Sequence, residues 1–441
     1  MAKRHLNTLG SFESVFLRLE ELVLANSGAD EFDEVFKLVI AKLWDEKSHD
    51  GKRFHAYGTE LETYDAVTSL LREAGRHWIG VVEAFETPLL TPEHLAICVE
   101  ALSKHKIFNS GLEVIDGFFE FTIAKSAKSS KGQFFTPRHV IEMCVRMVAP
   151  QQNESVLDPA CGSGGFLFHT LDYMRRNEHL DDRQIIDYCK DRLWGFDIDG
   201  RAVKVAKALM ILAGDGNSNI FRVNSLLMPN KEQTLWSSRS SQDSILSIED
   251  VVRTRIRNHG GFDIIVTNPP FAGEIREKSV LDNYWVARGK LRVERDLLFV
   301  ERCIDLLRPG GRIAVVLPHN KFASDSFGFL REWIIKQARI LGVVSLGRHT
   351  FLPHTHQKAS VLFAQKRHVK RTESDENIFF AVSEMDGKNS KGQWNWKSLN
   401  NNTGHLWDDV AHDLGEIEHG FADFCKKEGI SMGGSHGGLR G

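Results

Sequence analysis

Residues 155–177 read SVLDPACGSGGFLFHTLDYMRRN, and this stretch decides the fold. It opens with a short apolar run, residues 155–158, that predicts a buried strand. Gly162, Gly164 and Gly165 follow, and glycines permit a tight turn and the close approach of a ligand to the backbone. Apolar residues at three- and four-residue spacings then predict a helix for the rest of the stretch. The stretch is therefore a strand, a glycine-rich turn and a helix.

The residues after this unit continue the alternation of strand and helix. Apolar runs bounded by turn residues predict further strands at residues 192–198, 219–223, 262–267, 311–318, 339–346 and 358–366. Amphipathic patterns predict helices at residues 201–214, 295–307 and 325–337. Alternating strands and helices indicate an α/β fold with a doubly wound, mainly parallel sheet. Such sheets bind ligands beyond the carboxyl ends of their strands.

The chain divides into four expected regions. Residues 1–124 carry a helical pattern, interrupted by NSGAD at residues 26–30, and predict an all-helical N-terminal domain. Residues 125–133 are rich in lysine, serine and glycine and predict an exposed linker. We expect the α/β domain at residues 134–370. A C-terminal extension at residues 371–441 is expected to be partly helical with a glycine-rich tail.

The composition is that of an ordinary globular protein. Of the 441 residues, 42% are hydrophobic and 26% are charged, and the net charge is −3. This charge does not indicate a nucleic-acid partner, so any such binding needs a local patch or a second subunit. The six cysteines are scattered without a CxxC pair, which disfavours a zinc site or a disulfide framework. With no signal peptide or membrane span in the pattern, we expect a cytoplasmic protein without a membrane partner.

The glycine-rich turn does not have the dinucleotide spacing G-x-G-x-x-G, which argues against a dehydrogenase. Asp158, at the end of the first strand, is unfavourable beside a pyrophosphate and suits a ligand with a positive amine. Asp197 ends the second strand, where an acidic residue commonly binds ribose hydroxyls. Asp199 is expected to be a helix N-cap. Taken singly, the turn is also typical of a plain connection and Asp197 of a solvated carboxylate.

Residues 262–271 read FDIIVTNPPF, an apolar run followed by an asparagine and two prolines. The prolines fix two φ angles, remove two backbone donors and hold Asn268 in extended geometry. The side-chain carbonyl of Asn268 and the backbone carbonyl of Pro269 present two acceptors, which suit an amino group with two hydrogens. Phe271 can stack on the ring that carries this amine.

Seven segments occur in an order that resembles N6-adenine DNA methyltransferases. They are GQFFTPRHVIEMCVRM (132–147), VLDPACGSGGFLFHTL (156–171), GFDIDGRAVKVAKALMIL (195–212), SNIFRVNSLL (218–227), FDIIVTNPPF (262–271), GGRIAVVLPHNKF (310–322) and VVSLGRHTFLPHTHQKASVLF (343–363). The likeness covers roughly residues 10–366 and extends to the modification (M) subunit of type I restriction-modification systems. It implies the S-adenosylmethionine-dependent methyltransferase fold, S-adenosyl-L-methionine as cofactor and no metal.

The resemblance also implies roles for individual residues. The implied cofactor-binding residues are Phe134, Thr136, Pro137, Asp158, Ala160, Gly162, Gly164, Asp197, Ile198 and Asn224. Of these, residues 134–137 resemble the motif at the methionine end of the cofactor. Asp197 resembles the ribose ligand and Ile198 the contact to the adenine. Asn224 departs from the family, which usually has aspartate facing the adenine amino group.

The implied catalytic residues are Asn268, Pro269, Pro270 and Phe271. The two carbonyl acceptors would hold both hydrogens of an adenine N6 amino group, so that its lone pair points at the methyl group. The base must first be flipped out of the duplex, at a cost of a few kcal/mol that stacking on Phe271 partly offsets. Phe351 is a candidate for a second stacking face.

The resemblance implies double-stranded DNA, a specificity (S) subunit and a restriction (R) subunit as partners, with two M subunits to one S. Residues 367–441 are short for a target-recognition domain, which agrees with recognition by a separate subunit. Two alternatives remain open: a stand-alone methyltransferase for RNA or for a protein glutamine amide, and a catalytically weakened structural subunit. Asn224 is the residue that supports the second alternative, and the complete NPPF motif argues against it.

Residues 229–261 are long for a connection and predict a surface insertion with a short helix. Basic residues lie at its end and after the NPPF motif, at Arg253, Arg255, Arg257, Arg288, Lys290, Arg292 and Arg295. Their pattern fits a DNA-facing patch and a solvated charged face equally well.

Overall fold

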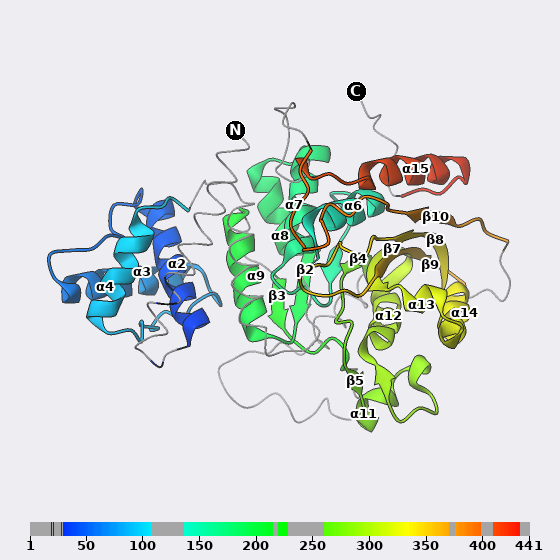
Figure 1. Ribbon diagram of the computed structural model, residues 1–441, viewed down its shortest axis with the longest axis horizontal. Helices are drawn as coiled ribbons and strands as arrows, with labels where there is room; N and C mark the ends of the chain where they lie inside the picture. Colours follow the sequence, from blue (N-terminus) through cyan, green and yellow to red (C-terminus); the bar gives the residue numbers. More distant parts are fainter. Residues whose placement is uncertain are drawn as a thin grey trace. The chain divides into compact units, whose positions relative to one another are not determined.

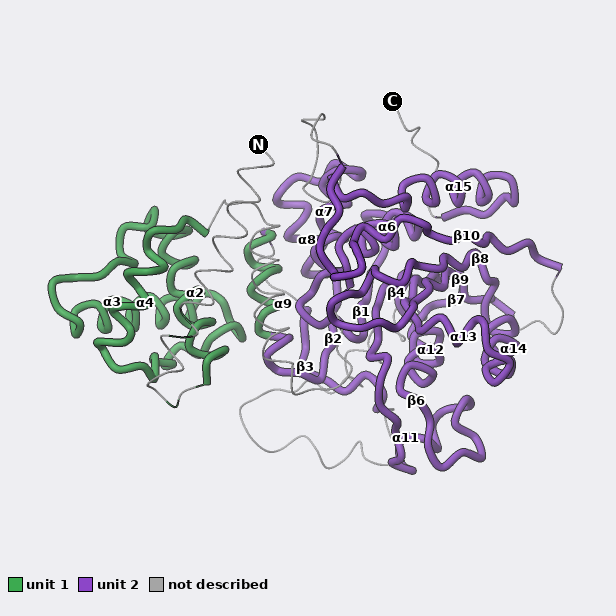
Figure 2. Tube along the Cα trace, in the orientation of Figure 1, with its two compact units in different colours: residues 1–129, 204–213 green, residues 130–203, 214–441 purple. Residues whose placement is uncertain are grey.

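The computed structural model describes residues 19, 21, 28, 30–107, 136–214, 219–227, 260–369, 375–397 and 409–432. Contacts divide the chain into two units, residues 1–129 with 204–213 and residues 130–203 with 214–441 (Figure 2). The predicted linker and most of the predicted insertion at residues 229–261 lie outside the described residues. The four domain boundaries expected from the sequence stay predictions.

The first unit contains α2 (Glu31–Ser48), α3 (Glu60–His77) and α4 (Pro92–Ser103). Each helix starts at a side-chain cap. The Asp30 side chain accepts a hydrogen bond from the Asp33 amide, Thr59 and Glu62 form a capping box, and Thr91 caps α4 ahead of a proline at its first turn. These three helices confirm the helical pattern predicted for this part of the chain.

The second unit is built on an eight-stranded sheet in the order β10-β8-β9-β7-β4-β1-β2-β3 (Figure 1). Its strands are β1 (Val156–Asp158), β2 (Leu193–Asp197), β3 (Asn219–Arg222), β4 (Phe262–Thr267), β7 (Leu307–Pro318), β8 (Ala338–Ser345), β9 (Ala359–Lys366) and β10 (Phe379–Val382). Every pairing is parallel except those of β9 with β7 and β8. A two-stranded ribbon pairs β5 (Glu274–Ile275) with β6 (Val293–Glu294).

Helices cover both faces of this sheet, as expected for a doubly wound fold. Those on one side are α6 (Arg138–Val148), α7 (Gly165–Asn177), α8 (Asp182–Arg192) and α15 (Leu414–Lys427), and those on the other are α12 (Arg295–Leu306) and α14 (Gly328–Gln337) (Figure 1). The other α-helices in the part of this unit's chain that the structure describes, or at its boundary with the first unit, are α9 (Gly200–Leu212), α11 (Lys278–Leu281) and α13 (Asn320–Ala323). The α/β fold class and the preceding helices are confirmed.

The strand register places the chemically unusual residues at one edge. Asp158 pairs with Gly195 and Asp197 with Arg222, while Thr267 pairs with a residue near the end of β7. Since these strands are parallel, their carboxyl ends meet at the same edge, here called the carboxyl edge. Apolar strand residues such as Phe196 and Phe262 are fully buried beneath it.

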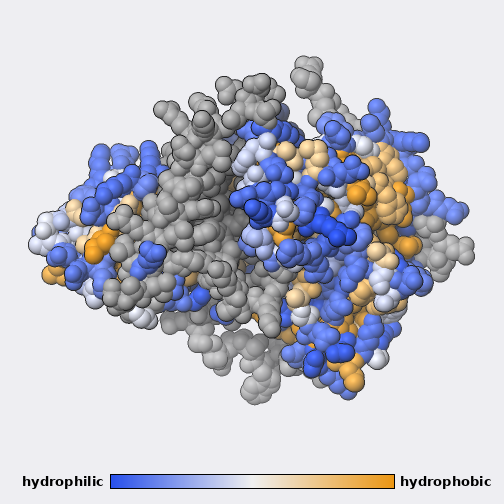
Figure 3. All heavy atoms as spheres, viewed as in Figure 1, coloured by the Kyte–Doolittle hydropathy of each residue, from blue (hydrophilic) through white to orange (hydrophobic). Residues whose placement is uncertain are grey.

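Where Figure 3 colours the surface, hydrophilic side chains predominate and hydrophobic patches lie between them. Large exposed apolar side chains include Ile198 after β2 and Phe380 and Val382 on β10. In the part of the chain that the structure describes, no helix has the length and apolar character needed to cross a bilayer. The six cysteines, all in described positions, are buried free thiols.

Candidate active site at the carboxyl edge of the sheet

The ends of β1 and β4 are joined by one side-chain hydrogen bond. Thr267 Oγ1 donates to Asp158 Oδ1 at 2.7 Å, and the Ala160 amide donates to the same oxygen at 3.0 Å. Both residues of the side-chain pair are buried. The bond fixes the end of β4 against β1, and therefore holds Asn268, the next residue, beside the glycine-rich turn. Thr267 was not among the predicted site residues.

The glycine-rich turn uses positive φ angles and leaves space beside its backbone. Gly162 has φ +52° and Gly164, the N-cap of α7, has φ +88°. The Gly164 amide donates to the Cys161 carbonyl at 2.8 Å. Among the described residues, and apart from the two chain neighbours of Gly162, no heavy atom lies within 4 Å of the position a Cβ would take on this glycine. The turn therefore gives a ligand direct access to the backbone, as the sequence predicts.

Asp197, at the end of β2, is bound to the turn and to the start of α9. Its two carboxylate oxygens accept hydrogen bonds from the amides of Asp199 and Gly162, each at 2.9 Å. Asp199 accepts the Arg201 amide at 2.9 Å, which confirms it as the N-cap of α9. Ile198, between the two aspartates, is 61% exposed. An acidic group and an exposed apolar side chain thus stand next to each other.

Burial controls the protonation of both strand-end carboxyls. It raises the pKa of Asp158 to about 7, against the opposing effect of the hydrogen bonds from Thr267 and Ala160. Burial also raises the pKa of Asp197, against the amide donors of Asp199 and Gly162. A cationic group placed here would stabilise the ionised carboxylates. The open turn, the paired acidic groups and the exposed Ile198 together fit a ligand with a positive amine, a diol and a flat ring.

The N-terminal end of α6 packs against this turn. Thr136 and Pro137 directly precede the helix and are buried. The Nη1 atom of Arg138 lies 1.9 Å from the position a Cβ would take on Gly165, so a larger first residue of α7 would require the Arg138 side chain to move. The predicted Thr136–Pro137 motif is therefore brought to the turn, while Phe134 lies outside the described residues.

Asn224 follows β3, and hydrogen bonds of its two neighbours hold it near Asp197 and the start of the glycine-rich turn. The Val223 amide donates to the Asp197 carbonyl at 2.8 Å, and the Ser225 hydroxyl donates to the Pro159 carbonyl at 2.6 Å. The side-chain oxygen of Asn224 accepts the Leu226 amide at 3.0 Å. A carbonyl oxygen has two lone pairs, so Asn224 still has one for a ligand amine.

The NPPF motif lies directly beyond β4. The side-chain oxygen of Asn268 is buried, Pro269 is buried and Pro270 is half-buried. Phe271 is 6% exposed, and its ring centroid lies 5.9 Å from that of Phe351, with the ring planes inclined at 63°. The structure thus brings the two predicted stacking residues together in edge-to-face contact. A base that stacks on Phe271 between the rings has to displace this contact.

The ribbon after the NPPF motif is anchored by a buried lysine that sequence reasoning missed. Lys321 is 2% exposed, forms an ion pair with Glu294 of β6 and lies 3.3 Å from Asp296 Oδ2. The Arg295 amide donates to the Gly273 carbonyl at 3.0 Å. These bonds attach the segment after Phe271 to the start of α12. The available signal was a lysine three residues after the end of an apolar strand.

The predicted basic clusters have mixed outcomes. Arg253, Arg255 and Arg257 lie outside the described residues. Lys290 Nζ sits 3.6 Å from the ring centroid of Phe329, and Arg292 lies 3.6 Å from Glu274. Their role in DNA contact stays a prediction.

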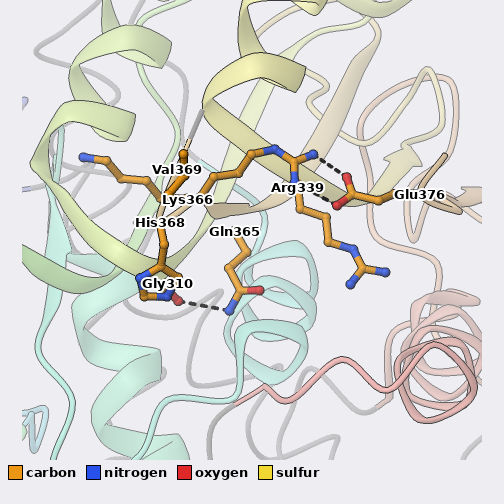
Figure 4. A pocket seen from close by; sticks show the side chains of 8 residues that line it. Gly310, Arg339, Gln365, Lys366, His368, Val369 and Glu376 are labelled. Atoms are coloured by element: carbon orange, nitrogen blue, oxygen red, sulfur yellow. Dashed lines mark hydrogen bonds and ion pairs between the residues drawn. The ribbon is translucent and has the colours of Figure 1, made fainter. Parts of the chain in front are cut away.

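A pocket of about 340 Å³ lies at the opposite, amino edge of the sheet (Figure 4). Its cations are engaged within the protein: Arg367 pairs with Glu376, and Lys366 Nζ donates to the Leu307 carbonyl at 2.7 Å. Gln365 donates to the Gly310 carbonyl at 3.0 Å. The side chains that line this pocket therefore hold strand ends together at the amino edge. They do not belong to the carboxyl-edge site.

Comparison with known protein families shows that the model of the N-6 DNA methylase family matches residues 113–431 of this chain. The type I restriction enzyme EcoEI methylase subunit of Escherichia coli is 28% identical over 238 residues, which are 53% of this chain and 42% of that protein. The type II restriction enzyme and methyltransferase RM.BcgI of Heyndrickxia coagulans is 24% identical over 306 residues, 68% of this chain and 41% of that protein. The chain spans about half the length of the curated relatives it matches.

Solved structures show the same fold. The type I restriction-modification system methyltransferase subunit from Streptococcus thermophilus superposes with a TM-score of 0.56 at 15% identity, covering 94% of this chain and 93% of that one. The sheet order, the glycine-rich turn after β1 and the NPPF motif after β4 agree with the family match over residues 113–431. The chain belongs to the N-6 DNA methylase family.

Proposed function

We propose that this chain transfers a methyl group from S-adenosylmethionine to the N6 amino group of an adenine flipped out of double-stranded DNA. It does so as the modification subunit of a type I restriction-modification system. One observation carries the proposal: the Thr267–Asp158 hydrogen bond of 2.7 Å holds the NPPF motif directly beside the glycine-rich turn. The subsite that would bind the amino group and the subsite that would bind the cofactor therefore lie next to each other at the carboxyl edge.

The cofactor subsite consists of residues from β1, β2 and the segment after β3. Asp158 and the turn would hold the amino acid end of S-adenosylmethionine, Asp197 the ribose, and Ile198 and Asn224 the adenine. The buried carboxyls, whose pKa values burial raises, favour a cationic ligand. When bound, S-adenosylmethionine supplies a methyl group activated by a positive sulfur.

The acceptor subsite positions the amine. Adenine N6 is a poor nucleophile because its lone pair is delocalised into the ring. The Asn268 side-chain carbonyl and the Pro269 backbone carbonyl accept the two N6 hydrogens, which draws the nitrogen towards tetrahedral geometry. Phe271 receives the flipped base by stacking. Alignment of two bound reactants lowers a barrier by roughly 7–11 kcal/mol at best. After transfer, the nitrogen loses one proton to water.

The partners are proposed to be DNA, a specificity subunit and a restriction subunit, with two modification subunits to one specificity subunit. The name of the EcoEI relative supports the type I assembly, whereas RM.BcgI is a type II restriction enzyme and methyltransferase. The helical first unit would clamp DNA and contact the specificity subunit. Residues 253–257 and 288–295 would supply cations for the phosphates.

The test is transfer of a radiolabelled methyl group from S-adenosylmethionine to unmethylated DNA. The purified chain is assayed alone and after co-expression with the specificity subunit from the same source. We expect sequence-specific labelling that requires the specificity subunit. Methylation of one defined sequence by the chain alone would exclude the type I assembly. Labelling of RNA or protein in place of DNA would exclude the proposed substrate.

A further inference from the structure

The C-terminal segment, defined as residues 383–397 and 409–413, folds into a compact support beside the active site. The Asn395 amide donates to the Gly387 carbonyl at 2.9 Å, and the Ala411 amide donates to the Asn395 carbonyl at 2.8 Å. The Asp413 carboxylate accepts the Ser383 hydroxyl at 2.6 Å. These long-range bonds fix the segment as one piece. The proposed mechanism above assigns it no role.

The segment contacts the aromatic loop, defined as residues 347–353, which carries Phe351. Lys388 is buried, and its Nζ donates to the Leu352 carbonyl at 2.7 Å. The same Nζ lies 4.4 Å from the ring centroid of Trp394, within the range of a cation–π contact. A buried ammonium group is thus directed at the backbone of the residue next to Phe351.

Asp386 makes a second contact with the aromatic loop. Its Oδ2 accepts the His349 amide at 3.1 Å and pairs with His349 Nδ1 at 2.9 Å. A Cβ on Gly347 would lie 1.1 Å from Asp386 Oδ1. Gly347 does not have a positive φ, so the glycine is needed for space and not for its backbone conformation. The carboxylate lies directly over the start of the loop.

Two further contacts enclose the same loop. A Cβ on Gly392 would lie 2.8 Å from the Pro353 nitrogen, so the backbones of segment and loop touch. On its other side, the segment packs against α6: the rings of His412 and His139 stack at 5.1 Å, and Trp394 meets His139 edge-on at 5.7 Å. The segment therefore bridges the helix that follows Thr136–Pro137 and the loop that holds Phe351.

We infer that Asp386 and Lys388 are positioning residues for the target base, because they hold the aromatic loop and so set where Phe351 meets Phe271. This inference rests on the proposed function. The rings are in contact at 5.9 Å, so a small shift of the loop changes the space available to a flipped base. Loss of the anchor should therefore reduce turnover while cofactor binding, which uses other strand ends, is retained.

The test compares Lys388→Met with Lys388→Arg and with Lys391→Met in the full chain co-expressed with the specificity subunit. Methionine keeps the length of the side chain and removes the donor, arginine restores a donor, and Lys391 is an exposed lysine of the same segment. We expect Lys388→Met to lower kcat on DNA by about 10- to 100-fold. The Kd for S-adenosylmethionine should stay within about twofold, and Lys388→Arg should recover most of the loss.

A double-mutant cycle isolates the second contact. Gly347→Ala should lower kcat in the wild-type background, because the new methyl group displaces the Asp386 carboxylate. In an Asp386→Ala background the same change should have little further effect. Additive effects would show that Gly347 is required for another reason and would overturn the role of Asp386.

Hydrogen–deuterium exchange gives a readout that does not depend on activity. Lys388→Met should speed exchange in peptides that cover residues 347–353 and leave peptides from β4 unchanged. If the wild-type complex transfers no methyl group to DNA, the proposed function fails while this readout still tests the anchor. Unchanged exchange, wild-type turnover in Lys388→Met, or parallel loss of folding and cofactor binding would each overturn the inference.

Discussion

At the amino edge of the sheet, Asp263 accepts hydrogen bonds from Ser155 and forms an ion pair with Arg308. At the carboxyl edge, the donors to Asp158 are the Thr267 hydroxyl and a backbone amide, both neutral. Burial raises the pKa of Asp263, but its bonds to Ser155 and Arg308 outweigh this effect and lower it. For Asp158 burial prevails and raises the pKa to about 7.

The opposite pKa shifts of Asp263 and Asp158 show that the two edges of the sheet use buried carboxylates in different ways. Amino-edge carboxylates are neutralised by arginines of the chain itself and so contribute to folding. The carboxyl-edge groups Asp158 and Asp197 are buried with neutral donors, a costly arrangement that a cationic ligand relieves. Mutations at the two edges should therefore have different consequences, stability at one and chemistry at the other.

Arg312→Met is expected to have the largest effect, on stability. The Arg312 guanidinium donates to both carboxylate oxygens of Glu154, at 2.6 and 2.7 Å, and to the carbonyls of Val148 and Ala149. Its removal leaves a buried carboxylate unpaired, so the free energy of unfolding in urea should fall by about 3–5 kcal/mol. Arg183→Met, at an exposed arginine of α8, is the control. Unchanged stability of Arg312→Met would show that the ion pairs at the amino edge do not contribute to folding, and would contradict the difference between the two edges.

Asn268→Ala should have the largest effect on chemistry. It removes one of the two proposed acceptors for the amine, and the rate of methyl transfer should fall by about 10²–10³-fold, as for loss of one preorganised hydrogen bond in a transition state. Calorimetry should give an unchanged Kd for S-adenosylmethionine. Asn283→Ala, at an exposed asparagine, is the matched control. A variant with full activity would contradict the assigned role of Asn268.

Asp197→Ala should weaken cofactor binding. The change removes the proposed ligand of the ribose hydroxyls, and charge-assisted hydrogen bonds of this kind contribute roughly 1.5–3 kcal/mol. Calorimetric titration should show an affinity for S-adenosylmethionine lowered by about 10- to 100-fold. Asp187→Ala, at an exposed aspartate of α8, should bind as the wild type does. Equal affinities in both variants would place the cofactor elsewhere.

The pH dependence of S-adenosylmethionine binding should be the smallest of these effects, and Asp158 should contribute to it. Its pKa is raised from the ordinary value of 3.8 to about 7, so the carboxylate that attracts a cation is lost as pH falls through about 7. Affinity for S-adenosylmethionine should rise roughly three- to tenfold from pH 6 to 7.5. In the free chain, the same shift lowers stability as pH rises from about 4 to about 7. Asp158→Asn should flatten both profiles.

The sequence predicts the long elements because their signals are local. β4 and β7 contain continuous apolar runs, and α3 and α7 have periodic apolar residues next to caps or glycines. β10 was not predicted, since it has only four residues and each of them is half-buried or exposed. The β5–β6 ribbon has two residues in each strand, too few for any periodicity.

The sequence indicates candidate site residues where unusual residue types end predicted strands, as at Asp158, Asp197 and Asn268, and the structure brings these strand ends to one edge of the sheet. The hydrogen bonds that hold these residues in place were not predictable. The Thr267–Asp158 bond joins residues 109 positions apart, and the Lys388–Leu352 bond joins residues from separate regions of the chain. Neither pairing leaves a periodic trace in the sequence, because contact between distant segments depends on the completed fold.

The most direct test of the central claim is to identify the methylated nucleoside by mass spectrometry. Unmethylated DNA is incubated with S-adenosylmethionine and the complex of this chain with the proposed specificity subunit, in parallel with the Asn268→Ala complex. We expect N6-methyldeoxyadenosine from the wild-type reaction and about 10²–10³-fold less from the variant. A methyl group on any other nucleoside, or equal amounts from both complexes, would contradict it.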